Sequence, residues 1–266
     1  GKNGRVAYMV ADSAGHWQVW VASDDLSRAK RLTRGRYDSG WAVWSPDGNQ
    51  LAFDSNRTDH TPNAFDADRG NRNGYSAIYV MQANGRKLRK ITDPRPPMSD
   101  HKPRFSPDGT QLLFSRASGT ADKAPAALFT VRLDGSGLHR SYSLHVDDSD
   151  WSPDGKRIVL EAYPNPNAYG DIDVVDATGG RPTNLTRNPP GQAGSADPAW
   201  SPDGSKILFL DNRVVNGVGE TGLATIGGVC LGISLATIAS APSWQWTLPA
   251  CLLAGFGFYA LHNTLQ

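Results

Sequence analysis

A set of charged and aromatic residues recurs at matching places along this 266-residue chain, just upstream of four regularly spaced aromatic residues. Ionised and aromatic side chains together supply ion pairs, hydrogen bonds and apolar contact area, which suits a peptide or a loop of a partner protein. Capping of nearby backbone amides is the alternative role for the aspartates. Counting back three or four positions from each aromatic gives the candidate set: Trp41, His101, Lys102, Asp147, Asp148 and Asp197.

The aromatic residues themselves belong to a repeated motif. Each is followed directly by Ser-Pro-Asp-Gly, a sequence typical of a tight turn because proline presets φ and glycine accepts a positive φ. The copies recur at intervals close to the period of about 40–50 residues that indicates a propeller or another repeat array. We expect the aromatics to pack between repeats. The motif residues are Trp44, Pro46, Asp47 and Gly48; Phe105, Pro107, Asp108 and Gly109; Trp151, Pro153, Asp154 and Gly155; and Trp200, Pro202, Asp203 and Gly204.

Each repeat predicts four antiparallel strands. The strand carrying the aromatic comes first, and an alternating apolar strand such as 51–53 follows the turn. A third apolar strand such as 78–81 then runs to a Gly-bearing turn, and a polar strand ends in Leu-Thr or a related pair. Residues 6–33 read as a further copy that lacks its opening turn. Four-stranded sheets repeated in this way predict a mainly β chain folded as a propeller of about four blades.

The pattern resembles the TolB-type propeller family, which is similar to the WD-repeat group. The second copy carries the resemblance most fully, with Trp44–Gly48 followed by Ala-Ile-Tyr-Val-Met at 77–81. The resemblance covers about residues 4–213. It implies a propeller that binds proteins or peptides, located in the periplasm or otherwise outside the cytoplasm. The resemblance does not settle the function, because propellers carry many unrelated activities.

The repeat pattern stops near residue 213, and the composition of the chain changes. Residues 221–266 contain no Asp, Glu, Lys or Arg, and two apolar runs, 222–239 and 248–261, flank a Pro- and Trp-containing segment. Such runs predict a transmembrane helical hairpin, with a buried hairpin in a water-soluble protein as the alternative. We therefore expect three segments: a propeller at 1–213 that is truncated at both ends, a junction at 214–221 and an apolar α-helical hairpin at 222–266.

The last residues, 255–266, resemble a helix of the major facilitator transporter superfamily. The resemblance spans two helices at most, so it carries no transport activity to this chain. A membrane-anchored or transporter-fused propeller and an artefactual fusion of two coding segments both remain open as explanations of the tail.

Charge and composition limit the partners and the chemistry. The formal net charge is +1, which excludes a nucleic-acid partner recruited by bulk electrostatics. The sequence holds no Gly-x-Ser-x-Gly elbow, phosphate-binding loop or His-Glu-x-x-His motif, so we expect neither catalysis nor a cofactor. The insertion 57–75 places aspartates at alternate positions from Asp66, but its arginines and the missing closing Glu argue against calcium. We expect no bound metal.

Three functions remain in view. The first is a non-enzymatic scaffold that binds a protein or peptide through the candidate set. The second is the substrate-filtering propeller of a prolyl-oligopeptidase-like serine peptidase, whose catalytic domain would lie outside this sequence. The third is a membrane-associated module held by residues 222–261.

Overall fold

The computed structural model describes residues 4–58, 75–118, 126–143, 145–163, 170–189 and 194–211. The chain divides into two compact units, Gly1–Arg213 and Val214–Gln266. All of the second unit lies outside the described residues, and so does most of the insertion at 57–75. Among the residues that are described, no helix has the length and hydropathy needed to cross a membrane. The helical hairpin expected at 222–266 therefore stays a prediction.

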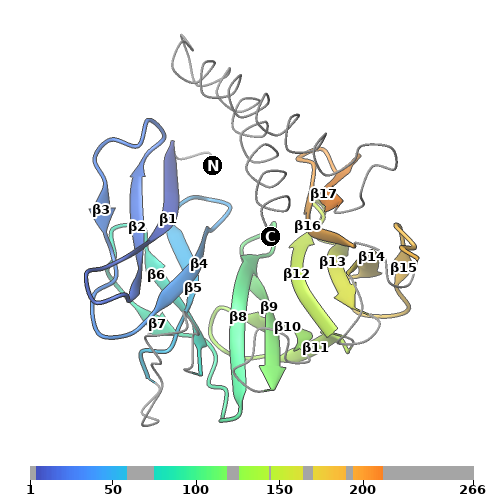
Figure 1. The fold of residues 1–266 in the computed structure, drawn as a ribbon, viewed down its shortest axis with the longest axis horizontal. Helices are drawn as coiled ribbons and strands as arrows, with labels where there is room; N and C mark the ends of the chain where they lie inside the picture. The colour runs from blue at the N-terminus through green and yellow to red at the C-terminus, as the bar shows by residue number, and fades with distance from the viewer. Residues whose placement is uncertain are drawn as a thin grey trace, which may run out of the picture. The chain divides into compact units, whose positions relative to one another are not determined.

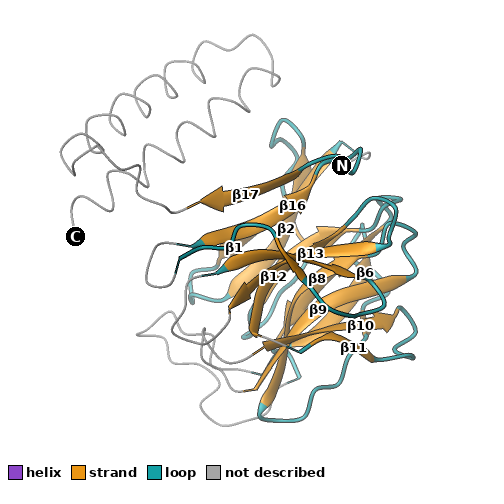
Figure 2. Cartoon of the chain, turned by 90° about the vertical axis from the view of Figure 1, so that its right-hand side faces the viewer, coloured by secondary structure: helices purple, strands orange, loops and turns teal. Residues whose placement is uncertain are grey.

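The described residues form five antiparallel sheets, which we call blades 1 to 5 in chain order (Figure 1). Each blade is a meander in which consecutive strands pair, and the described residues outside the strands are loops and turns (Figure 2). The prediction of a mainly β chain is confirmed, and three of the five sheets have the expected four strands, while the described residues give three strands in blade 1 and two in blade 5. The strands are, in blade 1, β1 (Arg5–Ala11), β2 (Trp17–Ser23) and β3 (Lys30–Arg31); in blade 2, β4 (Ser39–Trp44), β5 (Gln50–Ser55), β6 (Ala77–Gln82) and β7 (Arg89–Lys90); in blade 3, β8 (Met98–Phe105), β9 (Gln111–Ser118), β10 (Ala126–Arg132) and β11 (His139–Tyr142); in blade 4, β12 (His145–Trp151), β13 (Arg157–Tyr163), β14 (Asp171–Asp176) and β15 (Thr183–Asn184); and in blade 5, β16 (Ser195–Trp200) and β17 (Ile207–Asp211).

The Ser-Pro-Asp-Gly turns share one hydrogen-bond pattern in all four copies. In blade 4, the Ser152 hydroxyl donates to Asp154 at 2.6 Å and accepts the amide of Arg157 at 2.9 Å. Asp154 Oδ1 also accepts the amide of Lys156 at 3.1 Å, and Gly155 takes φ = +70°. The hydrogen bond from the serine is the main cause that lowers the pKa of Asp154. Every residue type in the motif therefore has a structural role in connecting the first strand to the second.

The turns also join neighbouring blades. A Cβ placed on Gly155 would lie 3.7 Å from Pro107 of the preceding blade, and the same relation links Gly109 to Pro46 and Gly204 to Pro153. Each of these three turns thus packs its glycine against the proline of the turn before it. The Ser-Pro-Asp-Gly turns therefore position successive blades against each other, in addition to connecting the first two strands within each blade.

The Leu-Thr ending compensates for a very short fourth strand. Strands β7 and β15 have only two residues each. In blade 2, Thr92 Oγ1 accepts the amide of Ile78 at 2.9 Å, and in blade 4, Thr186 Oγ1 accepts the amide of Ile172 at 3.0 Å. The threonine hydroxyl therefore continues the ladder where the backbone of the fourth strand has ended.

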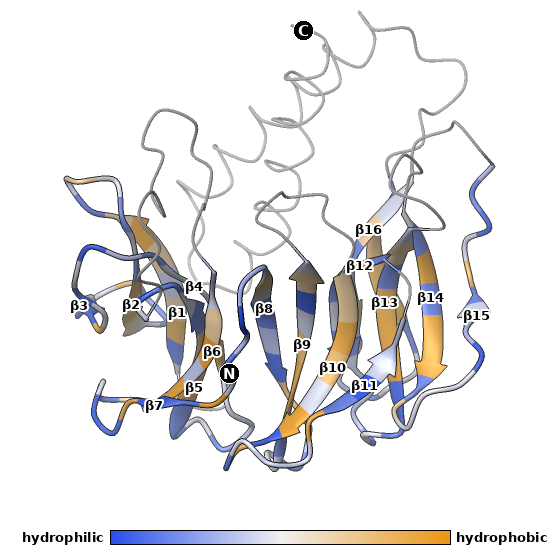
Figure 3. Cartoon of the chain, turned by 90° about the horizontal axis from the view of Figure 1, so that it is seen from below, coloured by the Kyte–Doolittle hydropathy of each residue, from blue (hydrophilic) through white to orange (hydrophobic). Residues whose placement is uncertain are grey.

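The hydrophobic core lies between blades. Blades 3 and 4 share a cluster that contains Leu113 and Leu128 on one side and Trp151 and Ile158 on the other. Trp44 and Phe105 pack in the same way against clusters shared with the preceding blade. Much of β10 and β14 is coloured as hydrophobic in Figure 3, and Leu128, Val131 and Val175 of these strands belong to the clusters. Packing between sheets thus fixes how each first strand is placed relative to the next.

One close approach between blades gives a stability prediction. Gly135, at φ = +86°, would place a Cβ only 3.1 Å from the carbonyl oxygen of Ile91, whereas the nearest atom to a Cβ on Gly155 is in ordinary contact at 3.7 Å. Gly135→Ala should destabilise the fold by about 2–3 kcal/mol, because a backbone contact adds to the strain of a positive φ. Gly155→Ala, the matched control, should cost about 1 kcal/mol. Urea denaturation of both variants tests this, and equal losses would contradict the close contact.

Candidate functional site

The first strands of blades 2 to 5 contact one another in chain order, so they form the innermost layer of the fold. Each has a break in register against its second strand at the same place. The breaks lie between Gly40 and Val43 in β4, His101 and Arg104 in β8, Val146 and Ser149 in β12, and Ala196 and Ala199 in β16. An extra residue at such a β-bulge redirects its side chain, and bulges are common beside functional sites.

The candidate residues chosen by sequence lie at these bulges. Trp41, Lys102 and Asp197 all adopt left-handed backbone conformations, with φ of 49°, 52° and 50°. Such conformations cost free energy for residues other than glycine, and they are enriched where a site needs a particular side-chain direction. In β12 the same place is occupied by two aspartates, Asp147 and Asp148.

Three of the candidates form a chain of contacts across three blades. Lys102 Nζ lies 4.8 Å from the ring centroid of Trp41 in blade 2, and it also bonds Asp147 Oδ1 in blade 4. The lysine side chain is largely buried at 14% exposure, while Asp147 is half exposed. A cation over an indole ring and beside a carboxylate is held by both partners. The sequence brought these residues into one set, and the structure joins them directly.

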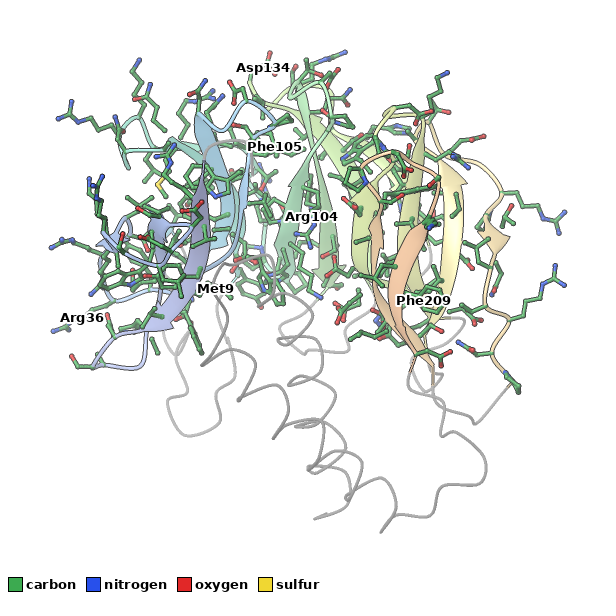
Figure 4. All side chains as sticks on the ribbon, turned by 90° about the horizontal axis from the view of Figure 1, so that it is seen from above. Met9, Arg36, Arg104, Phe105, Asp134 and Phe209 are labelled. Atoms are coloured by element: carbon green, nitrogen blue, oxygen red, sulfur yellow. The ribbon has the colours of Figure 1, made fainter. Side chains whose placement is uncertain are left out.

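Asp148 and His101 are tied into the framework. Arg104 Nη2 bonds Asp148 Oδ1 at 3.1 Å, and Asp148 is buried. His101 Nδ1 lies 3.0 Å from Asp54 Oδ2, and its Nε2 lies 2.7 Å from the hydroxyl of Ser99. The Arg104–Asp148 and His101–Asp54 contacts link neighbouring blades. These two candidates therefore position the inner strands, and Arg104, beside Phe105 on β8 in Figure 4, is a member of the set that sequence reasoning missed.

Asp197 is exposed, and its carboxylate makes no ion pair or hydrogen bond with the residues that the structure describes. Burial of part of the carboxyl group, with the negative charges of Asp148 and Asp147, raises the pKa of Asp197. Lys102 and Arg104 act in the opposite direction. Because the net effect is upward, the surroundings of Asp197 disfavour further negative charge.

Glu161 on β13 is the second residue that the sequence did not single out. It is 3% exposed, and its Oε2 accepts the amide of Asp197 at 3.3 Å while Oε1 accepts the hydroxyl of Tyr163. Burial raises the pKa of Glu161 to about 7, and the charges of Asp147 and Asp197 contribute. A glutamate within the apolar strand 157–163 was the available signal.

These residues form one group, which we call the inner-strand cluster: Trp41, Lys102, Arg104, Asp147, Asp148, Glu161 and Asp197. Its four carboxyl groups outnumber its two cations, and an indole ring adds apolar surface. Within the described ranges, no three His, Cys, Asp or Glu side chains are arranged to hold a metal. The arrangement is suited to recognition by charge and contact area.

Two curated proteins share sequence with this chain. An uncharacterised peptidase of Bacillus subtilis, YuxL, is 28% identical over 195 residues, which is 73% of this chain and 25% of that protein. An uncharacterised protein of Agrobacterium fabrum, Atu1656, is 27% identical over 194 residues, covering 68% of this chain and 57% of its own length. The chain therefore spans between a quarter and three fifths of these relatives. No family model matches it.

The fold has solved relatives as well. TolB from Acinetobacter baumannii superimposes with a TM-score of 0.59 at 21% identity, over 80% of this chain and 48% of that one. Together with the repeated antiparallel sheets, this likeness defines the class of the protein. The chain is a β-propeller, and its fold is similar to that of TolB.

Proposed function

We propose that this protein is a non-enzymatic propeller scaffold that binds an extended peptide or a loop of a partner protein at the inner-strand cluster. The observation that carries the proposal is the Trp41–Lys102–Asp147 chain, which brings an indole, a cation and a carboxylate from three blades to neighbouring bulges. Aromatic and charged anchors of this kind dominate the energetics of protein interfaces. The exposed Asp197 carboxylate supplies a further group for a ligand.

Selection of a phage-displayed random dodecapeptide library on the intact protein tests the proposal. Peptides that are enriched should lose about tenfold or more in affinity with Trp41→Ala and with Asp197→Ala, because truncation of an interface anchor commonly costs over 1 kcal/mol. Asp134→Ala, on an exposed turn at the outer rim shown in Figure 4, is the control and should leave binding unchanged. Peptides that bind the Trp41 and Asp197 variants as tightly as the wild type would contradict the proposal.

A second candidate is the substrate-filtering propeller of a serine peptidase. It is supported by the similarity to the peptidase YuxL, which extends over 73% of this chain but only 25% of that protein. This function requires a Gly-x-Ser-x-Gly nucleophile motif in the same gene beyond the propeller. Sequencing the contiguous gene decides the point, and a complete reading frame without that motif would eliminate this candidate.

The proposal includes a location outside the cytoplasm, which the likeness to TolB-type propellers supports. Fusion of the complete reading frame to alkaline phosphatase, which is active only after export, tests it. Activity equal to that of a signal-less fusion would contradict this location.

A further inference from the structure

The outer edges of blades 1 to 3 carry exposed cations. Each edge runs from the end of the next-to-last strand through the short last strand of the blade, at residues 24–31, 84–90 and 132–140. Three exposed acidic residues lie on these edges, Asp24, Asp25 and Asp134. The exposed cations, which we call the basic rim, are Arg28, Lys30, Arg86, Lys87, Arg89, Lys90, Arg132 and Arg140.

The basic rim is continuous from blade to blade. Lys30 Nζ on β3 donates to the carbonyl of Asn84 in the hairpin of blade 2 at 3.5 Å, and Arg89 Nη1 on β7 donates to the carbonyl of Leu133 in blade 3 at 3.1 Å. A hydrogen bond to a carbonyl leaves the charge of the cation uncompensated. Among the described residues, Lys90 is the only member of the rim in an ion pair. The three edges therefore form one surface with an excess of positive charge.

The exposure of the basic rim does not depend on a strand that the structure leaves undescribed. Strands β3, β7 and β11 are the outermost strands of their sheets. The undescribed residues of blades 2 and 3, at 59–74 and 119–125, connect the second strand to the third. In an antiparallel meander, the strand ends that they connect lie opposite to the hairpins before the last strands. The rim is thus the outer margin of sheets whose last strands are in place.

Exposed leucines are interspersed with these cations. Leu26, Leu88 and Leu138 are 68%, 44% and 48% exposed. Leu26 takes the hairpin position that Gly85 and Gly135 hold in the next two blades, and its φ is 62°. This conformation costs free energy for a leucine, so neither burial nor backbone preference accounts for the residue type there.

Charges on an edge strand can also have the role of preventing the edge from pairing with other chains. Two observations distinguish the basic rim from that role. The last strand of blade 4, Thr183–Asn184, is as short as β3 and β7 but carries no charge. Exposed leucines would promote association of edges and would not prevent it. The mixture of cations and leucines therefore requires another explanation.

We propose that the basic rim of blades 1 to 3 binds the surface of a bilayer that contains anionic lipids. The cations pair with the phosphate headgroups, and the leucines enter the boundary between headgroups and acyl chains. Binding at this boundary gains from both buried apolar area and attraction to anionic lipids. An acidic protein would pair with the cations without requiring the leucines. The rim is separate from the inner-strand cluster, and its binding does not depend on the function proposed for that cluster.

Co-flotation of the full chain with vesicles tests the proposal. The affinity for phosphatidylcholine vesicles with about 30% phosphatidylglycerol should be at least about tenfold higher than for pure phosphatidylcholine at about 0.1 M salt, because several cations each contribute about fivefold. The preference should largely disappear at about 0.5 M salt, which screens the charges. Residues 221–266 contain no Asp, Glu, Lys or Arg, so any binding through them is common to both vesicles. Equal affinity for the two vesicles would overturn the proposal.

Charge reversal locates the surface. Arg86→Glu/Lys87→Glu should weaken binding to the anionic vesicles by about 25-fold or more, since it removes two contributions of about fivefold each. Lys156→Glu/Lys206→Glu, in the turns of blades 4 and 5, is the matched control because it changes the net charge equally. All four side chains are exposed, so both variants should fold, and a cooperative melt confirms it. Equal losses in the two variants would contradict a site at the rim.

The leucines distinguish a bilayer from a soluble acidic partner. Leu26→Gly/Leu88→Ser should weaken binding to the anionic vesicles by about tenfold or more, because each methylene group buried in the bilayer contributes about fourfold. The same variant should bind poly-L-glutamate, a soluble polyanion, as tightly as the wild type. Glycine accepts the positive φ at position 26, so the fold should be retained. Unchanged binding of this variant to the anionic vesicles, or an equal loss of poly-L-glutamate, would overturn the proposal.

Discussion

Glu161→Gln is expected to stabilise the protein by about 3 kcal/mol at pH 8 and to leave its stability almost unchanged at pH 4. Burial raises the pKa of Glu161 from its ordinary 4.5 to about 7, and a tenfold change in proton affinity corresponds to about 1.4 kcal/mol. The folded state thus binds the proton more tightly than the unfolded state. Stability attributable to this group is complete below pH 4.5 and is lost as the pH rises to about 7. Glutamine, like the protonated acid, has one acceptor oxygen and one donor group, so it can accept the Asp197 amide and donate to the Tyr163 hydroxyl oxygen.

Urea denaturation of the wild type and of Glu161→Gln at a series of pH values from 4 to 8 measures this difference. Asp154→Asn is the control of opposite sign in the same blade. The hydrogen bond from Ser152 lowers the pKa of Asp154, so that carboxylate stabilises the fold above its ordinary pKa and loses this effect as the pH falls. The asparagine variant should therefore be the less stable one at pH 8. A pH-independent difference between Glu161→Gln and the wild type would contradict the buried, proton-binding carboxyl group.

Glu161 also connects the two ends of the inner-strand cluster. It bonds the backbone of the bulge at Asp197, and the charge of Asp147 from β12 acts on it. Its counterpart in blade 2, Asp54, meets the side chain of His101 instead. The same repeat position therefore links the second strand of one blade to the first strand of the next blade in both places. In blade 4 it does so with an acid whose ionisation opposes folding, which places a titratable group beside the proposed ligand.

The repeat made the fold predictable because each residue of the Ser-Pro-Asp-Gly turn satisfies a local requirement. The Ser152 and Asp154 bonds stay within a few residues of each other, so the sequence alone specifies them. Counting from the aromatic then placed Trp41, Lys102 and Asp197 at equivalent bulges, since equivalent repeats bulge at equivalent positions.

Contacts between blades could not be predicted in the same way. Lys102 pairs with Asp147, which is 45 positions away, and Arg104 pairs with Asp148 at a separation of 44. Which aspartate meets which cation depends on the packing of β8 against β12, and single-repeat patterns do not contain that information. Asp148 and Asp197 both stand three residues before a tryptophan, so the repeat pattern treats them as equivalent. The sequence therefore did not show that Asp148 is buried and Asp197 is exposed.

Arg116→Met is expected to destabilise the protein by about 3–5 kcal/mol, because it leaves a buried carboxylate without its partner. Arg116 Nε and Nη2 bond the two carboxylate oxygens of Asp100 at 2.5 and 2.8 Å, and Asp100 is completely buried. The Asp100 hydrogen bond is the main cause that raises the pKa of Arg116. The guanidinium also lies near the rings of Phe114 and Phe129, at 5.5 and 5.1 Å from their centroids.

The double variant Asp100→Ala/Arg116→Met separates the ion pair from simple packing. Removing both charges should cost less than Arg116→Met alone, since no uncompensated carboxylate then remains in the interior of blade 3. Arg116→Lys should fall between the wild type and Arg116→Met, because lysine restores the charge without the two-pronged geometry. Urea denaturation at pH 7 gives all three values. If Arg116→Met cost less than about 1 kcal/mol, or if the double variant were the less stable of the two, the pair would not be holding β8 against β9.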